Sequence, residues 1–494
     1  MEDNAILRLQ NGSDIRGVAI TTENGERTLT RETVGAIGAA LAVYLKQKLG
    51  KEKLRIAVGN DSRITAQEMF KYLCSGLCSE GAKVTYTGLS STPAMFMSTV
   101  MPGYEYDAGI MITASHLPYD RNGFKIFTRN GGFEKSDIKA VLTLAQDMRI
   151  ADAEGEYDTR DIMDAYSSSL CDTIIKKAGC GNKPLSGLHI IIDAGNGAGG
   201  FFETKVLRAL GANTEGSVAT APDGNFPTHA PNPEDKEAMA SFSKAVKEAK
   251  ADLGIIFDTD VDRAAVVLSD GSEINRNRLI ALMTTIVKKD HEKPVIVTDS
   301  VTSTGLAEFI EGCGAVHRRF KRGYRNVINE AVRLCAEGED ACLAIETSGH
   351  GAMKENSFLD DGAYMAALIT ARLAELKAEN RYLSDLIADL KEPVESTEIR
   401  FKVLESDFAA YGEKVLLALK ERVLNEEGLS LAPDNFEGVR VNADKTHGDG
   451  WFLLRLSLHD PVLPLNIESN SKGGVCTMQA WITEFLSEFK GLSL

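Results

Sequence analysis

Residues 54–63, LRIAVGNDSR, carry the pattern on which the fold prediction rests. The first half of this stretch is largely apolar, which favours a strand, and the second half, GNDSR, supplies the polar residues of a turn. A helical stretch follows at 66–79, and Gly81 then leads into another strand-like run. This order of strand, aspartate-containing turn, helix and strand predicts half of a parallel βαβ unit.

The same order returns twice along the chain. The second copy has a strand at 189–192 closed by Asp193 and a helix at about 200–210, and the third has a strand at 295–298 closed by Asp299. In each copy a glycine and a small residue stand between the helix and the next strand. Three copies of this unit predict three α/β domains, each with a mixed, mostly parallel sheet flanked by helices.

The pattern changes after a linker at 387–397, which begins as a helix and is broken by Pro393. Beyond it we expect helices at 407–425 and 477–489. Three strands are expected between them, at 437–443, 451–457 and 463–468. This mixture is typical of an α+β domain. We therefore predict an α/β protein of three successive α/β domains and a smaller C-terminal α+β domain, with bounds at 1–160, 161–272, 273–390 and 391–494.

Length, composition and charge narrow the class of protein. A chain of 494 residues with 43% hydrophobic residues can bury several cores. The start of the chain is acidic and no apolar run is long enough for a membrane span, so we expect a cytoplasmic protein. The eight cysteines form no CxxC pair, which indicates reduced thiols. A net charge of -16 argues against a nucleic-acid partner and leaves room for a local basic pocket, and the short apolar runs give no reason to expect a membrane partner.

The loop after the strand-like run at 109–112 combines several reactive side chains. Its sequence TASHLP places Ser115 on a turn beside His116, and Lys125 follows ten residues after the serine. The loop therefore offers an oxygen nucleophile, an acid or base, and a cation that could hold a phosphate. The alternative interpretation is an ordinary exit from a strand, in which the serine and histidine only make hydrogen bonds within the loop.

Three aspartates alternate between two strand-like runs in the stretch DTDVDR, at Asp258, Asp260 and Asp262. Alternating carboxylates can converge on one hard cation, and three ligands leave positions open for a phosphate oxygen on Mg²⁺. An EF-hand would require a glycine in place of Arg263 and helices on both sides, so that interpretation fails. The remaining alternative is a solvated acidic hairpin tip, in which three close like charges would repel one another.

A glycine pattern in the second copy allows a different class of enzyme. Gly195, Gly197 and Gly200 satisfy GxGxxG after a strand, and Glu215 stands near the position of a ribose-binding acid. A nicotinamide-dependent enzyme is therefore a rival interpretation. The other two copies keep the aspartate without the glycines, so a recurrent aspartate turn is the simpler explanation.

Three further polar clusters could recognise a phosphorylated ligand. Arg16 stands in a turn with small neighbours that would let its guanidinium approach a phosphate. Glu346 and Ser348 alternate at a strand end, where they could bind vicinal sugar hydroxyls, and a basic turn at 320–325 precedes them. The loop 455–461 brings arginine, serine and histidine donors together. Taken singly, each cluster could also be a turn or a surface feature.

The order of these motifs resembles that of the α-D-phosphohexomutase superfamily, the phosphomannomutases and phosphoglucomutases, over nearly the whole chain. TASHLP is similar to its phosphoserine loop, DTDVDR to its magnesium loop, the stretch 346–350 to its sugar-recognition loop and 455–461 to its distal phosphate loop. These loops would fall in the first, second, third and fourth domains in turn, around a central cleft.

The resemblance also implies a role for each matching residue. The implied catalytic residues are Ser115, His116, Lys125, Arg16 and Arg263; the implied metal ligands are Ser115, Asp258, Asp260 and Asp262; the implied substrate-binding residues are Lys321, Glu346, Ser348, His350, Arg455, Ser457 and His459. Ser115 would carry the phosphoryl group with one Mg²⁺ per chain. A hexose 1,6-bisphosphate would serve as intermediate and activator, and the chain would be a monomer or a dimer.

Several positions depart from the family pattern. The distal phosphate loop has Leu456, Leu458, His459 and Asp460 where the family usually has Pro, Gly or Asn, Thr and Glu, and Thr347, Tyr324 and Leu117 replace the usual residues of other motifs.

As a whole, the resemblance implies a mutase that moves a phosphoryl group between C1 and C6 of glucose or mannose phosphate. A phosphoglucosamine mutase and a non-catalytic phosphosugar-binding protein are the alternatives.

Overall fold

The computed structural model describes residues 5–23, 25–149, 154–457 and 460–493. The chain divides into two compact units, one of Met1–Asn275 with Ser348–Asp385 and one of Arg276–Thr347 with Leu386–Leu494. Within the described ranges, no helix is both long enough and apolar enough to cross a membrane.

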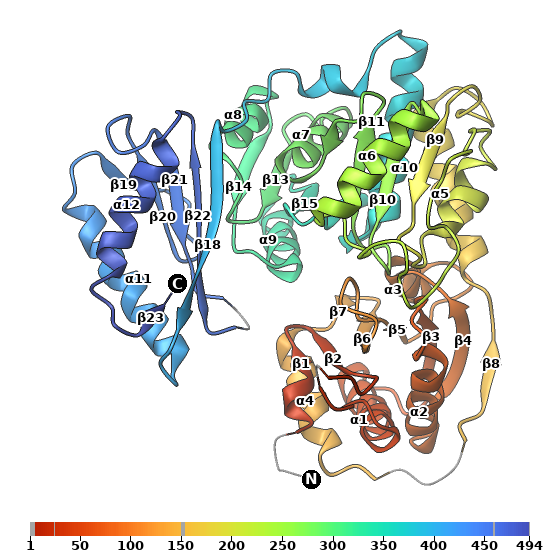
Figure 1. Cartoon of the computed structure of the whole chain (residues 1–494). Helices are drawn as coiled ribbons and strands as arrows, with labels where there is room; N and C mark the ends of the chain where they lie inside the picture. Colours follow the sequence, from red (N-terminus) through yellow and green to blue (C-terminus); the bar gives the residue numbers. More distant parts are fainter. Residues whose placement is uncertain (1–4, 24, 150–153, 458–459, 494) are drawn as a thin grey trace. The chain divides into compact units, whose positions relative to one another are not determined.

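The first unit opens with a mixed sheet of eight strands, whose main path runs β1-β2-β6-β5-β3-β4-β8 while β7 pairs with β6 (Figure 1). The strands are β1 (Gln10–Asn11), β2 (Asp14–Val18), β3 (Arg55–Asn60), β4 (Lys83–Leu89), β5 (Ala108–Ile112), β6 (Arg121–Thr128), β7 (Gly131–Gly132) and β8 (Tyr157–Thr159). Strand β3 is parallel to β4 and β5, whereas β6 is antiparallel to β2 and β5. The carboxyl end of β5 therefore faces the start of β6 across a short loop.

Alternating residues on these strands build two cores, one on each face of the sheet. Ile56, Val58 and Ile110 pack in a core with α1 (Arg31–Leu49), α2 (Ala66–Ser79) and α4 (Lys135–Ala145). Their neighbours Ala57 and Met111 face α3 (Thr92–Val100) in a second core. This period of two makes the domain an α/β/α sandwich. The predicted helix at 66–79 is confirmed as α2.

A second, four-stranded sheet in the same unit runs β12-β11-β10-β9. Its strands are β9 (Ile190–Asp193), β10 (Leu253–Phe257), β11 (Ala264–Leu268) and β12 (Glu273–Ile274). Helices α6 (Lys236–Ala249) and α10 (Gly362–Ala378) pack against β10 and β11, and α5 (Met163–Ala178) packs against α10. Strands β9 and β10 are parallel, and β10 and β11 form an antiparallel hairpin. The helix expected at about 200–210 is a short π-helix, Phe202–Leu207.

The second unit contains the third α/β motif. Strand β13 (Val295–Thr298) is parallel to both β14 (Val316–Arg319) and β15 (Leu343–Ile345). The helices of this motif are α7 (Arg276–Val287), α8 (Thr304–Gly312) and α9 (Tyr324–Ala336). The chain then returns to the first unit, where β16 (Gly351–Met353) and β17 (Leu359–Asp360) form an antiparallel pair before α10.

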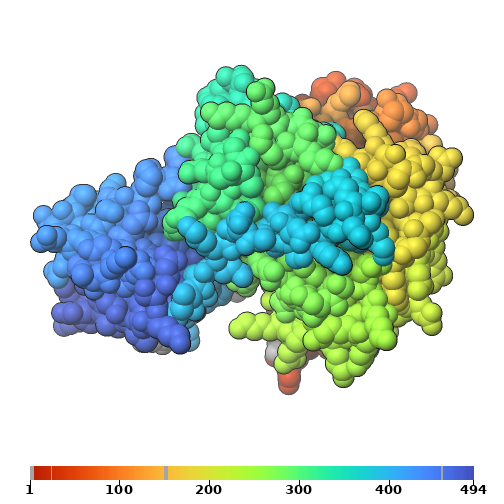
Figure 2. Space-filling view, turned by 90° about the horizontal axis from the view of Figure 1, so that it is seen from above, coloured from red at the N-terminus to blue at the C-terminus, as the bar shows by residue number. Residues whose placement is uncertain are grey.

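The C-terminal part of the second unit is an antiparallel sheet with two helices. Its order is β19-β20-β21-β22-β18-β23. The elements are β18 (Glu395–Val403), α11 (Phe408–Leu424), β19 (Leu429–Leu431), β20 (Val439–Ala443), β21 (Gly450–Leu454), β22 (Val462–Ser469), α12 (Gly474–Leu486) and β23 (Leu492–Ser493). The blue atoms of this α+β domain form one continuous group in the space-filling view (Figure 2).

The predicted linker is wrong at its C-terminal end. A 3-10 helix, Leu383–Ile387, precedes an irregular stretch, but β18 already begins at Glu395 and pairs with β22 along eight residues. The first part of β18, ESTEIR, alternates exposed with partly buried residues. Such a half-solvated strand has no apolar run, so its sequence is similar to that of a loop.

The contact between α1 and α2 depends on glycine at the crossing. A Cβ atom on Gly76 would lie 2.0 Å from the Gly35 carbonyl oxygen, whereas a Cβ on Gly312, at the end of α8, would meet nothing within 4 Å.

We expect Gly76→Ala to lower the thermal unfolding midpoint of its unit, because the cost of overpacking, about 1–3 kcal/mol, exceeds the gain of about 1 kcal/mol in helix propensity. Calorimetry should show no fall for Gly312→Ala; equal effects of the two variants would mean that the helix crossing tolerates a methyl group.

Candidate active site

Ser115 lies in the loop between β5 and β6 in a backbone conformation that serine rarely adopts. Its φ is +50°, in the left-handed region, and its amide donates to the Thr113 hydroxyl at 2.8 Å. Its side-chain hydroxyl donates to Asp258 Oδ2 at 3.0 Å, although the two residues are 143 positions apart. The serine is 7% exposed. The loop therefore directs this hydroxyl into the aspartate loop of the second sheet.

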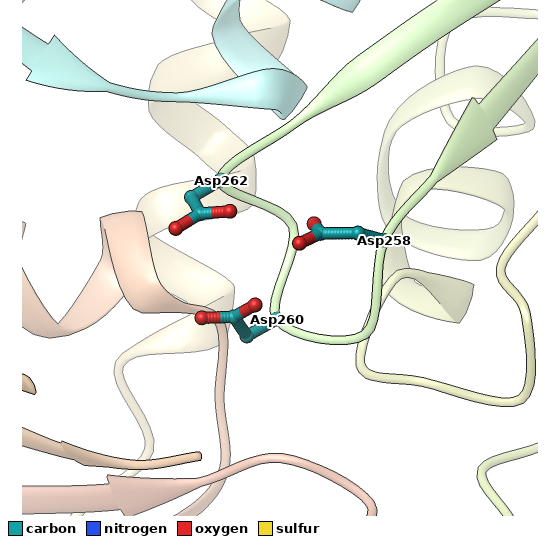
Figure 3. A group of neighbouring side chains, drawn as sticks. All are labelled: Asp258, Asp260 and Asp262. Carbon is teal, nitrogen blue, oxygen red and sulfur yellow. The ribbon is translucent and has the colours of Figure 1, made fainter. Parts of the chain in front are cut away.

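The three aspartates lie in the loop that joins β10 to β11. Ligand atoms of Asp258, Asp260 and Asp262 all lie within 4.8 Å of one another, and all three residues are buried. Figure 3 shows their carboxylates turned toward a common space. In the described chain, Asp260 Oδ1 and Asp262 Oδ1 accept no hydrogen bond. Closely spaced carboxylate oxygens that accept no hydrogen bond are suitable ligands for a hard divalent cation, so these residues fit Mg²⁺.

Two cations compensate part of this buried negative charge. Lys125, on β6, lies with its Nζ 3.2 Å from Asp260 Oδ2 and donates to Asp262. Arg263 Nε lies 3.2 Å from Asp258 Oδ2. Burial opposes the charge on Lys125, but Asp260 and Asp262 outweigh that effect and hold its pKa well above the usual value. Burial, and then the neighbouring carboxylates Asp262 and Asp260, raise the pKa of Asp258 well above its usual range.

Arg263, the second of these cations, also has a guanidinium nitrogen that donates no hydrogen bond within the described residues. Arg263 is 1% exposed and donates from Nη1 to Asn232 Oδ1 at 3.1 Å, while its Nη2 has no hydrogen-bond partner within the described residues. Arg16 donates to the Thr113 carbonyl and to Asp14 at 2.7 Å. An unpartnered guanidinium nitrogen beside Ser115 and Asp258 fits a phosphate oxygen.

Two histidines flank the serine and the aspartates. His116 Nδ1 lies 3.3 Å from Ser115 Oγ, and burial together with the charge of Arg263 lowers the pKa of His116 to about 2. His350 Nε2 lies 3.7 Å from Asp262 Oδ1, and its Nδ1 is 2.9 Å from Ser348 Oγ. Burial lowers the pKa of His350 as well. Both environments therefore favour the neutral form of the imidazole.

Two other residues of this site were missed in the sequence. Thr92, at the start of α3, donates to Asp260 Oδ2 at 2.5 Å and from its amide to the Asp260 carbonyl at 2.8 Å. Asp14 holds the Arg16 guanidinium. The only signal for Thr92 is its place in the helix-start sequence SSTP, which does not reveal a partner in another sheet.

The glycines of the GxGxxG pattern are explained by close packing of the protein backbone. A Cβ on Gly197 would lie 2.5 Å from the Thr259 carbonyl oxygen in the aspartate loop, and one on Gly200 would lie 2.3 Å from the Thr220 carbonyl oxygen. Gly195 has φ +53°. These residues are needed for turns and for contact with the aspartate loop, so they give no support to a nicotinamide site.

Two of the predicted sugar-binding residues, Lys321 and Glu346, lie in the second unit. Glu346 follows β15 and accepts a hydrogen bond from the Gly323 amide at 2.6 Å, in the basic turn that contains Lys321. Thr347 donates to Asp299 Oδ2 from both its amide, at 3.2 Å, and its hydroxyl, at 2.7 Å. Burial, and then the charge of Asp299, raise the pKa of Glu346 to about 8.

The predicted distal phosphate residues lie in the C-terminal domain. Arg455 follows β21, is 8% exposed, and its Nε has no hydrogen-bond partner among the described atoms. Ser457 donates from its amide to the Val462 carbonyl at 3.0 Å, and its hydroxyl accepts from the Asp460 amide at 3.3 Å. His459 and its neighbour Leu458 lie outside the described residues.

The raised pKa of Glu346 makes a pH-dependent contribution to stability. Because the carboxyl binds its proton more tightly when folded, its contribution is fully present below pH 4.5 and is lost as the pH rises to about 8. We expect Glu346→Gln to remove this loss and to raise the thermal midpoint at the upper end of that window by on the order of a few degrees.

Glu330 is the matched control in the same unit. It is also buried, and its hydrogen bonds with Arg333 and Arg318 lower its pKa. Stability from Glu330 is present above its unfolded pKa and is lost as the pH falls, so Glu330→Gln should destabilise most at neutral pH. Calorimetry of both variants across pH checks that their thermal midpoints shift in opposite directions. If the two midpoints changed with pH in the same way, the environment described for Glu346 would be contradicted.

Three family models match successive parts of the chain. They describe phosphoglucomutase/phosphomannomutase α/β/α domain I at residues 7–148, domain II at 168–271 and domain III at 275–394. The chain is 32% identical over 463 residues to a phosphomannomutase/phosphoglucomutase of Pseudomonas syringae pv. tomato, covering 93% of this chain and 90% of that protein. It is 29% identical over 469 residues to a phosphoglucomutase of Neisseria gonorrhoeae, covering 94% of each.

A solved structure agrees with this result. The crystal structure of a phosphoglucomutase/phosphomannomutase family protein from Burkholderia thailandensis superposes with a TM-score of 0.79 at 27% identity, covering 99% of this chain and 98% of that chain. The fold class predicted from the repeated motif is thereby confirmed. From its domain matches and its relatives, the chain belongs to the phosphoglucomutase/phosphomannomutase family of the α-D-phosphohexomutase superfamily and is a phosphohexomutase, an isomerase.

Proposed function

We propose that this phosphohexomutase moves a phosphoryl group between C1 and C6 of glucose or mannose phosphate, through a phosphoserine at position 115 and a hexose 1,6-bisphosphate. The observation that carries the proposal is the 3.0 Å hydrogen bond from Ser115 Oγ to Asp258 in the aspartate loop. It joins a hydroxyl suited to accept a phosphoryl group to a set of ligands suited to a divalent cation. The names of the relatives support the sugar class.

The proposed transfer exchanges the bond between phosphorus and the serine oxygen for a bond between phosphorus and a sugar oxygen. The bond from phosphorus to Ser115 Oγ breaks, a bond from phosphorus to a sugar hydroxyl oxygen forms, the sugar hydroxyl proton passes to a base, and an acid gives a proton to the leaving Ser115 oxygen. His116 and Lys125 are the acid/base candidates: His116, whose lowered pKa favours the neutral imidazole that can accept a proton, lies 3.3 Å from Ser115 Oγ, and Lys125, whose raised pKa favours the charged ammonium that can donate one, lies beside Asp260 and Asp262. Arg263, with its unpartnered Nη2, would neutralise charge on the transferring oxygens, and Arg16 would lie nearby.

Asp258, Asp260 and Asp262, with the phosphate on Ser115, would hold the Mg²⁺. When bound, that ion supplies charge neutralisation for the phosphoryl oxygens and for the serine oxygen as leaving group. The buried aspartates by themselves repel one another, so the site gains from a cation whether or not substrate is present.

The remaining sugar and phosphate groups are assigned to the other motifs. Lys321, Glu346, Ser348 and His350 would bind the sugar hydroxyls, and Arg455, Ser457 and His459 the phosphate that is not reacting. One serine serves both ends of the sugar, so the bisphosphate must turn between the two transfers. A distal site that accepts either orientation is therefore part of the proposal.

The first test replaces the proposed phosphoryl carrier. Ser115→Ala removes the oxygen proposed to carry the phosphoryl group, so we expect loss of mutase activity by at least about 10³-fold with glucose 1-phosphate or mannose 1-phosphate. Intact mass should show no phosphate on the variant. Ser167→Ala is the matched control, because its buried hydroxyl donates only to the Met163 carbonyl of its own helix. Retention of activity in Ser115→Ala would exclude the phosphoserine mechanism.

The second test measures metal binding without catalysis. Asp260→Asn removes one charged ligand, and we expect titration calorimetry to show Mg²⁺ affinity at least about tenfold weaker than in the unchanged protein. Asp193→Asn is the control, since Asp193 is also buried but pairs with His229 at 2.7 Å outside the aspartate loop. Equal Mg²⁺ affinity in all three proteins would refute the assignment of the loop to the metal.

A further inference from the structure

Arg63 makes an unusual number of contacts with the loop that carries Ser115. Its Nη2 donates to the carbonyls of Ser115 and Leu117, each at 2.6 Å, and its Nη1 donates to those of Pro118 at 2.6 Å and Arg121 at 2.9 Å. The arginine side chain is 0% exposed. One guanidinium therefore supplies hydrogen bonds to three carbonyls of the loop between β5 and β6 and to that of Arg121, the first residue of β6.

The charge on Arg63 is held by Asp61, just after β3. Arg63 Nε lies 3.3 Å from Asp61 Oδ2, and the Arg63 amide donates to Asp61 Oδ1 at 2.9 Å. The Asp61–Arg63 pair thus reaches the backbone of Ser115 through its carbonyl, which accepts a hydrogen bond from Arg63 Nη2.

A segment of the second sheet's domain closes over this pair. The ring of Phe226 lies 5.2 Å from the Arg63 guanidinium carbon. Gly224 approaches so closely that a Cβ there would lie 2.4 Å from the Ile64 amide nitrogen and 2.5 Å from the Ser62 carbonyl oxygen. The aromatic face and the tight backbone contact keep the guanidinium buried and add a favourable cation–π interaction.

The backbone of Ser115 needs such support. Its φ of +50° is costly for a residue with a side chain, and a strained backbone persists only where its surroundings fix it. If the turn relaxed, Ser115 Oγ would leave its position 3.0 Å from Asp258. We infer that Arg63 is a positioning residue that holds Ser115 in its left-handed conformation and so aims the phosphoryl-accepting oxygen. The inference rests on the proposed role of Ser115 as phosphoryl carrier.

The test compares two Arg→Lys variants. Arg63→Lys keeps the charge but lacks the planar fork that reaches four carbonyls. Arg372→Lys is the matched control, because Arg372 is also a largely buried arginine paired with a carboxylate, Glu375 at 2.6 Å, within α10. Three quantities are measured with Mg²⁺ present. They are the amide hydrogen exchange of peptides spanning 113–121, the rate at which glucose 1,6-bisphosphate phosphorylates Ser115, followed by quenched-flow intact mass, and KM for glucose 1-phosphate in the mutase assay.

We expect Arg63→Lys to raise exchange in 113–121 by about tenfold or more and to slow phosphorylation about 10²-fold, with KM for glucose 1-phosphate within about threefold of the unchanged protein. Arg372→Lys should change none of these. Unchanged exchange and rate in Arg63→Lys, or equal losses in both variants, would overturn the inference.

Two outcomes are separated by the design. If the unchanged protein never takes phosphate onto Ser115, the proposed function fails, and hydrogen exchange alone decides whether Arg63 holds the turn. If Arg63→Lys is recovered unfolded, the same measurements are made on Asp61→Asn, which keeps the guanidinium and removes its charge partner. Faster exchange in 113–121 and slower phosphorylation in that variant support the inference, and unchanged values oppose it.

Discussion

Burying three carboxylates in one short loop is the constraint on which the rest of the first unit depends. Asp258, Asp260 and Asp262 repel one another, and without compensating charge their burial would cost several kcal/mol per ion. The fold supplies cations from two directions, with Arg263 next to the loop itself and Lys125 from the first sheet. The electrostatics of one sheet are therefore completed by a strand of another.

The same constraint places the reactive serine. Strands β5 and β10 both end at this point, and the loops that follow them meet, as the carboxyl ends of strands do in α/β folds. Thr92 anchors the Asp260 backbone to the start of α3, and the close approach of Gly197 to Thr259 supports the loop from the other side. A helix start and a glycine turn thus fix the geometry that the charged groups require.

The sequence predicted the repeated architecture well because its signals are local. Helix α2 has a clear apolar period and a glycine beyond its end, and the aspartate loop stands between two apolar strands, so the predictions for both agree with the structure. The first residues of strand β18 fall within the predicted linker, because they alternate between exposed and half-buried positions and form no apolar run. The π-helix at Phe202–Leu207 has no sequence signal that separates it from an α-helix.

Pairings between distant residues could not be predicted in the same way. The residue types at 115, 258, 260 and 262 indicate phosphoryl chemistry, but nothing in their spacing shows that Lys125 would lie on the carboxylates or that Thr92 would reach Asp260. The role of Arg63 is hidden for the same reason, because its partners are backbone carbonyls, which have no sequence signature. These contacts depend on how two sheets pack.

The left-handed backbone at residue 115 also limits which amino acid can occupy the position. Threonine carries the same hydroxyl group, yet its branched Cβ makes this region of the Ramachandran map a true outlier. Tyrosine would carry its oxygen a full aromatic ring further from the main chain. Among the three hydroxyl amino acids, the turn geometry therefore selects the unbranched, shortest one, and does so before any requirement of the chemistry is considered.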